Sequence, residues 1–134
     1  MKAVAIIGPK NCYTKRKKVK EAISKLRNIN PNIVILSGGN ECGIEQDVKE
    51  TAITYGLKYK EFNPAFTEHN DYSVMDKSYF NKKYHYSHIV KRYDMLLQNT
   101  DVLVVGYDDG SQIDPVYYKL LTIAQKKNKK IIFI

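Results

Sequence analysis

The sequence predicts an α/β fold: a single Rossmann-like domain over residues 1–134, with a doubly wound parallel sheet and helices on both faces. Short, continuously apolar runs alternate with longer segments whose apolar residues recur at helical spacing. The short runs lack the alternation of a half-exposed strand, which is typical of buried parallel strands. Turn-forming residues follow three of these runs, at 8–9, 37–39 and 106–110. Right-handed crossovers then predict five strands in the order 3-2-1-4-5.

The first half of the chain contains three predicted strands and two predicted helices. Residues 2–7 predict the first strand, residues 33–36 the second, and residues 57–62 a third, weaker one. Apolar residues at helical spacing predict one helix in each connection. In the first helix they are Val19, Ala22, Ile23 and Leu26. In the second, one face is lined by Ile44, Val48, Thr51, Ala52 and Tyr55.

The second half begins with a break in this pattern. Residues 63–83 carry scattered aromatic and polar side chains and predict a lid-like insertion with little regular structure. Helical spacing resumes over residues 86–97, and an apolar run at 101–105 predicts the fourth strand. A last helix over 116–124 and a last strand over 130–134 complete the expected order.

Composition and charge limit the classes of function. The net charge is +8, from 22 Lys and Arg against 14 Asp and Glu, which favours phosphorylated or polyanionic partners. No apolar run approaches the roughly 20 residues of a membrane helix, so we expect no membrane association. The two cysteines form no CxxC, and His85 and His88 have no third ligand at matching spacing, so we expect neither a metal nor a cofactor. A cytoplasmic location follows from the same observations.

In this architecture ligands bind beyond the carboxyl ends of the strands, where the strand order reverses. The three turns there are rich in glycine and lead toward helix N-termini, whose N–H groups suit phosphate. The alternative is that these glycines only allow tight turns and close helix packing. No Walker loop or GxGxxG is present, so ordinary dinucleotide binding is not expected. The candidate ligand-binding residues are Gly8, Pro9, Lys10, Ser37, Gly38, Gly39, Asn40, Gly43, Glu45, Arg92, Gly106, Asp108, Asp109, Gly110 and Ser111.

Three charged residues have both a structural and a functional interpretation. Glu45, in the first turn of its helix, either stabilises the helix dipole or accepts a hydrogen bond from a ribose hydroxyl. Arg92 either lies on a solvated basic face or grips a phosphate. Asp114, directly before Pro115, either caps a helix or supplies the carboxylate for glycosidic cleavage. The basic residues around the first helix start, Lys10, Lys15, Arg16, Lys17, Lys18 and Lys20, either form a solvated face, steer an anion or bind DNA.

Three segments resemble motifs of the SLOG superfamily, which includes the DprA Rossmann domain and the LOG proteins. Residues 37–48 resemble the SGGxxGxD turn, residues 92–96 the R-N-x-x-M helix, and residues 110–114 the second turn. The resemblance implies a Rossmann-like pocket for a nucleotide or nucleotide-derived ligand. In the LOG branch an Arg and a Glu cleave the N-glycosidic bond of a nucleoside monophosphate, and they fall on Arg92 and Asp114 here.

Four departures from the LOG pattern favour binding over hydrolysis. The second turn lacks PGG, Asp114 replaces the Glu, Tyr93 replaces the Asn of the helix motif, and Glu45 replaces the Asp of the first turn. The leading hypothesis is therefore a sensor, carrier or sequestering protein for a nucleotide-derived small molecule. The alternatives are an N-glycosidic hydrolase or transferase, with Asp114, Arg92 and Glu45 as catalytic residues, and a nucleic-acid-binding module. The resemblance and the aromatic residues of the insertion also suggest a homodimer.

Overall fold

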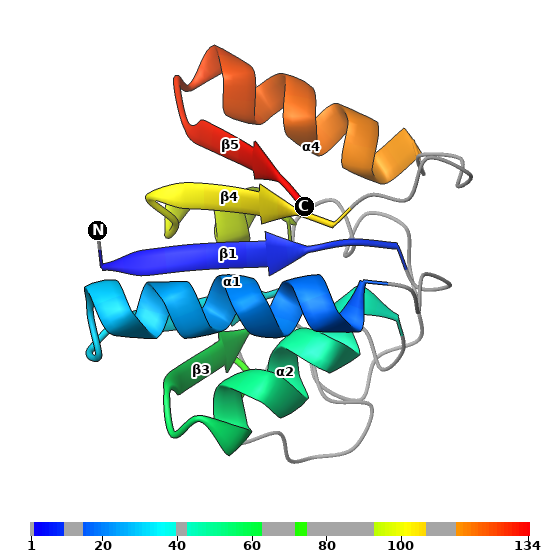
Figure 1. The fold of residues 1–134 in the computed structure, drawn as a ribbon. Helices are drawn as coiled ribbons and strands as arrows, with labels where there is room; N and C mark the ends of the chain where they lie inside the picture. Colours follow the sequence, from blue (N-terminus) through cyan, green and yellow to red (C-terminus); the bar gives the residue numbers. More distant parts are fainter. Residues whose placement is uncertain (1, 10–14, 40–42, 63–71, 75–92, 107–114) are drawn as a thin grey trace.

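The computed structural model describes residues 2–9, 15–39, 43–62, 72–74, 93–106 and 115–134, without the side chains of 115–118. Five strands form one sheet in the order β3-β2-β1-β4-β5, and every neighbouring pair is parallel (Figure 1). The strands are β1 (Ala3–Ile7), β2 (Val34–Ser37), β3 (Lys58–Glu61), β4 (Val102–Val105) and β5 (Lys130–Phe133). The predicted strand order is confirmed.

Helices cover both faces of the sheet, as expected from right-handed crossovers. On one face, α1 (Arg16–Ile29) and α2 (Ile44–Thr54) pack against alternate residues of β1, including Val4 and Ile6. On the other face, α4 (Pro115–Lys126) and the helical residues 93–98 pack against Ala5 and Ile7. Successive β1 side chains thus enter two separate cores, which explains why this strand is apolar throughout. Within the described ranges, none of the helices combines the length and apolar character needed to traverse a membrane.

Part of the predicted insertion lies against the outer edge of the sheet. Of residues 63–83, the structure describes 72–74, and Ser73 forms a parallel bridge with Glu61 at the end of β3. The Glu61 N–H donates to the Tyr72 carbonyl at 2.9 Å, and the Val74 N–H donates to the Glu61 carbonyl at 3.0 Å. Residues 72–74 therefore lie against β3 beside the carboxyl edge of the sheet.

The opposite, amino edge is held by polar contacts. The Asp101 carboxylate accepts hydrogen bonds from the N–H groups of Lys2 (2.9 Å) and Ala3 (3.1 Å). These two bonds lower the pKa of Asp101 below its ordinary value of 3.8. Thr100 adds a bond from the Ala5 N–H to its hydroxyl at 2.9 Å. The start of β1 is thereby fixed to the chain entering β4.

Candidate functional site

The loops that follow β1, β2 and β4 begin at one edge of the sheet (Figure 1). Backbone bonds join them: the Gly106 N–H donates to the Ile7 carbonyl at 2.9 Å, and the Ile44 N–H donates to the Pro9 carbonyl at 3.4 Å. The strand order reverses between β1 and β4, so this edge is where a ligand of such a sheet binds. The first N–H group of α2 therefore donates its hydrogen bond to the loop that follows β1.

The side chain of Ile44 fills the space beside two of the glycines at this edge. A β-carbon added at Gly8 would lie 2.8 Å from Cβ of Ile44, and one added at Gly106 would meet its Cδ1 and lie 3.2 Å from its Cγ2. Ile44 itself is fully buried and belongs to the α1–α2 core. Gly8 and Gly106 therefore let the start of α2 pack against the ends of β1 and β4, which is the structural interpretation of these two candidates.

Two glycines of the turn between β2 and α2 have backbone conformations that other residues rarely adopt. Gly39 has φ 77°, and Gly43, the N-cap of α2, has φ 73° and ψ −146°. Side chains disfavour positive φ strongly, and Gly43 lies in a region that glycine almost alone occupies. The backbone path from β2 into α2 thus depends on glycine at both positions.

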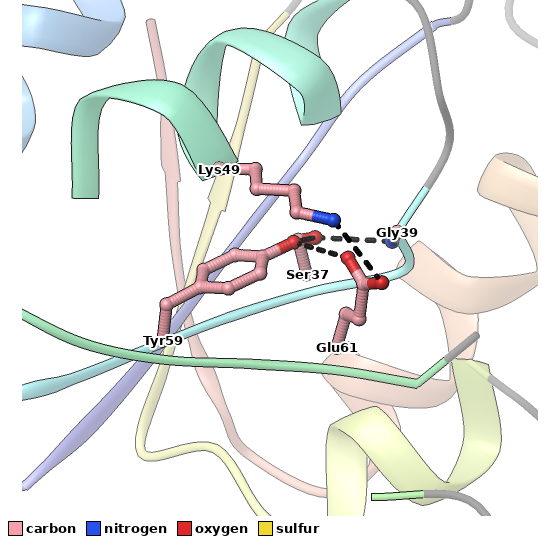
Figure 2. Close-up of polar contacts among 5 residues, drawn as sticks. All are labelled: Ser37, Gly39, Lys49, Tyr59 and Glu61. Atoms are coloured by element: carbon pink, nitrogen blue, oxygen red, sulfur yellow. Dashed lines mark hydrogen bonds and ion pairs between the residues drawn. The ribbon is translucent and has the colours of Figure 1, made fainter. Parts of the chain in front are cut away.

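A buried polar network lies beneath this turn (Figure 2). The Ser37 hydroxyl accepts the Gly39 N–H at 3.0 Å and lies 2.7 Å from the Tyr59 hydroxyl. Tyr59 donates to Oε2 of Glu61 at 2.8 Å, and Lys49 Nζ lies 3.6 Å from Oε1 of the same carboxylate. β2 and β3 place these groups together, because Ser37 pairs in register with Glu61. Burial and then the Glu61 carboxylate raise the pKa of Tyr59 well above its ordinary value of 10.

Tyr72, in the described part of the insertion, packs against the same network. The Tyr72 ring makes an edge-to-face contact with Tyr59, with ring centroids 5.6 Å apart. Lys49 Nζ lies 5.1 Å from the centroid of the Tyr72 ring, within the range of a cation–π contact. Because the Glu61 backbone also pairs with residues 72–74, the network and this part of the insertion form one packed unit.

Glu45 is fully buried and accepts a hydrogen bond from the Tyr93 hydroxyl, which lies 3.1 Å from Oε2 and 3.4 Å from Oε1. A β-carbon at Gly38 would lie 2.7 Å from that hydroxyl and would also meet the Glu45 carboxylate. A buried carboxylate needs such donors, because desolvation penalises its charge. Glu45 therefore holds Tyr93 across the turn, besides lying in the first turn of α2, where the helix dipole favours a negative charge.

The start of α1 carries exposed positive charge at the same edge. Arg16, Lys17, Lys18 and Lys20 are exposed, and the first turn of the helix contains no acidic residue. Arg16 lies 3.7 Å from Glu50 of α2 in an exposed ion pair. Burial raises the pKa of Asp47, which faces this group, although Arg16 acts in the opposite direction. The positive charges oppose the helix dipole, so local helix stability does not account for them.

Several predicted residues lie outside the described part of the chain, and their roles stay predictions. Among the ligand-binding and catalytic candidates these are Lys10, Asn40, Arg92, Asp108, Asp109, Gly110, Ser111 and Asp114. His85, His88 and both cysteines also lie there. Within the described ranges, no three His, Cys, Asp or Glu side chains gather closely enough to hold a metal ion.

The network residues Tyr59, Glu61 and Lys49 were not among the sequence candidates. A signal was present in the third strand, where Tyr59 and Glu61 alternate with two lysines. That alternation places both on one face, and the structure buries them while Lys58 and Lys60 are exposed. A buried glutamate in a strand requires donors, which Tyr59 and Lys49 provide.

No protein-family model matches this chain, nor does any curated protein sequence. Several solved structures share its fold. A molybdenum cofactor binding protein from the phototrophic bacterium Rippkaea orientalis is 16% identical with a TM-score of 0.69, and the match covers 98% of this chain and 75% of that one. The molybdenum cofactor carrier protein from Chlamydomonas reinhardtii is 14% identical with a TM-score of 0.67, over 99% and 76%.

DNA processing protein A from Helicobacter pylori, whose structure concerns single-stranded DNA binding, is 19% identical with a TM-score of 0.68, over 98% of this chain and 64% of that one. These proteins have Rossmann-like folds, the type of fold that the resemblance to the SLOG superfamily implies. This chain has the same Rossmann-like fold. The Rossmann-like fold expected from the sequence is therefore confirmed. The turn after β2 and the buried network meet at the carboxyl edge of its sheet.

Proposed function

We propose that this protein binds a nucleotide-derived small molecule at the carboxyl edge of its sheet, as a carrier, sensor or sequestering protein. The observation that supports it most is the glycine-dependent turn over Ser37–Gly39 and Gly43, which enters α2 beside the reversal of strand order. Two proteins that share this fold are described as binding or carrying the molybdenum cofactor. The candidate ligand contacts are the predicted residues of the three loops, with Arg92.

The test combines mass spectrometry of small molecules that co-purify with the protein and calorimetric titration with AMP, GMP, NAD and cyclic ADP-ribose. Gly43→Ala should weaken binding at least about tenfold, because a side chain is strained at its φ of 73° beside the site. Gly56→Ala is the matched control: its φ is 70°, nothing lies within 4 Å of an added β-carbon, and it lies at the other end of α2. Equal effects of the two substitutions would contradict the proposed location.

The same titrations separate binding from cleavage. Chromatography of the incubated nucleotides should recover them intact, because the departures around Asp114 and Tyr93 favour binding. Release of a free base would support the N-glycosidic alternative instead. If every nucleotide is recovered intact, no titration releases heat of binding and no ligand co-purifies, small-molecule binding is contradicted.

A second candidate function is nucleic-acid binding, supported by the exposed basic start of α1 and by the fold shared with the DNA processing protein. Lys17→Glu with Lys18→Glu should abolish a mobility shift of single-stranded DNA, and the wild-type shift should weaken steeply with salt. The control is Lys25→Glu with Lys127→Glu, which makes the same change in charge at exposed residues of the opposite edge. This control should weaken the mobility shift less. No shift at low salt would exclude this candidate.

We also propose that the protein is a cytoplasmic homodimer. The described part of the insertion exposes Tyr72 and Val74, each 38% accessible, beside the edge strand β3. Sedimentation equilibrium of the wild type and of Val74→Lys tests this, since a charge on that surface should shift the protein toward the monomer. If the monomer–dimer distribution of Val74→Lys equals that of the wild type, this surface is not the dimer contact.

A further inference from the structure

We infer that Tyr59 is a positioning residue for the Ser37–Gly39 turn and that it acts through the Ser37 hydroxyl. Tyr59 has a single hydroxyl hydrogen and two oxygen neighbours, Glu61 Oε2 at 2.8 Å and Ser37 Oγ at 2.7 Å. An ionised carboxylate only accepts hydrogen bonds, so Tyr59 donates to Glu61. Ser37 must then donate to Tyr59, which leaves its lone pairs for the Gly39 N–H at 3.0 Å.

The hydrogen bonds therefore run in one direction, from the Gly39 N–H through Ser37 and Tyr59 to Glu61. Ser37 is fully buried, and Tyr59 and Glu61 are 6% and 2% accessible, so bulk water does not compete with these bonds. The far end is held by Lys49 and by the pairing of the Glu61 backbone with residues 72–74. Without the Tyr59 hydroxyl, the Ser37 hydrogen loses its acceptor, and the Ser37 side chain is no longer held in the orientation that accepts the Gly39 N–H.

The orientation of one peptide group is what this chain of bonds controls. A peptide unit is planar, so a fixed Gly39 N–H also fixes the plane between Gly38 and Gly39. That plane carries the turn from the end of β2 toward α2, at the edge where we propose ligand binding. The effect of Tyr59 on affinity rests on that proposed function, whereas its effect on the Gly39 amide does not.

The experiment uses Tyr59→Phe, Ser37→Ala and the double variant of the full chain. In nuclear magnetic resonance spectra, each single variant should shift the Gly39 amide and speed its hydrogen exchange at least about tenfold. Affinity for AMP or GMP should fall about fivefold in each, corresponding to one hydrogen bond. Because Tyr59 acts through Ser37, the double variant should bind as Ser37→Ala does. Tyr55→Phe is the control, since Tyr55 lies outside the network beside Arg27.

Two results would overturn the inference. One is a Gly39 amide with unchanged shift and exchange in Tyr59→Phe, and the other is additive losses of affinity in the double variant. If neither AMP nor GMP binds, the affinity comparison is repeated with NAD, cyclic ADP-ribose or a co-purified ligand. If no ligand binds at all, the proposed function fails, but the amide measurement still decides the role of Tyr59. If Tyr59→Phe does not fold, the wild type decides: slowly exchanging hydroxyl hydrogens of Ser37 and Tyr59 support the inference, and rapid exchange of both contradicts it.

Discussion

The Tyr93 hydroxyl donates to the Glu45 carboxylate across the carboxyl edge of the sheet, 3.1 Å from Oε2. Tyr93 belongs to the core between the sheet and α4, whereas the residue before Glu45 belongs to the core beneath α1 and α2. The bond thus joins the two layers past Gly38, whose missing side chain leaves room for it. Both partners are buried, so the bond is shielded from competing water.

Tyr93→Phe should lower the free energy of unfolding by about 1–3 kcal/mol, because it removes a donor to a buried carboxylate. In a Glu45→Gln background the same substitution should cost less, since the neutral amide needs the donor less. Urea denaturation of the four proteins gives both values. Equal costs in the two backgrounds would show that the contribution of the Tyr93 hydroxyl does not depend on the charge of Glu45.

Gly106→Ala should destabilise the protein by about 1–3 kcal/mol through overpacking against Ile44. Ile44→Val should relieve much of that cost, because it removes the Cδ1 atom that an added β-carbon would meet. The same exchange should relieve Gly8→Ala far less, since there the added atom lies 2.8 Å from Cβ of Ile44, which valine retains. Thermal unfolding of single and double variants measures this, and similar relief at both glycines would contradict the packing described here.

Asp101→Asn should destabilise the protein by about 1 kcal/mol at pH 7, because it removes the charge from an exposed acceptor of two backbone bonds. The folded pKa of Asp101 lies below its ordinary value of 3.8, so its contribution is present above that pH and is lost as the pH falls through the folded pKa. The difference between variant and wild type should therefore shrink toward pH 2. Urea denaturation midpoints of both proteins across pH 2 to 7 test this. A difference in stability that does not change with pH would show that the loss comes from the changed side chain and not from the loss of its charge.

The order and type of the elements could be predicted because their signals are local. The apolar runs around Val4, Ile35 and Val104 have no polar face, and α1 and α2 show helical spacing. Right-handed crossovers between parallel strands then leave few arrangements. The turns at 8–9, 37–39 and 106 could be placed for the same reason, since each follows a strand directly.

The contacts within the site depend on residues far apart in the chain. Nothing near Gly8 or Gly106 in the sequence indicates that Ile44 fills the space beside both. The bond from Tyr93 to Glu45 spans 48 positions, and the return of residues 72–74 to β3 depends on a bridge to Glu61. Spacing predicts which residues share a helix or strand face, but it does not show which faces meet at a sheet edge.

The packing of Ile44 also constrains the order in which this sequence can change. Position 106 accepts a β-carbon at low cost only after position 44 has lost its Cδ1, so the two substitutions are tolerated in one order and selected against in the other. Position 8 is restricted further, because every residue except glycine at position 44 keeps the β-carbon that an alanine there would meet. Related sequences should therefore vary at 44 before they vary at 106, and should retain glycine at 8 longest.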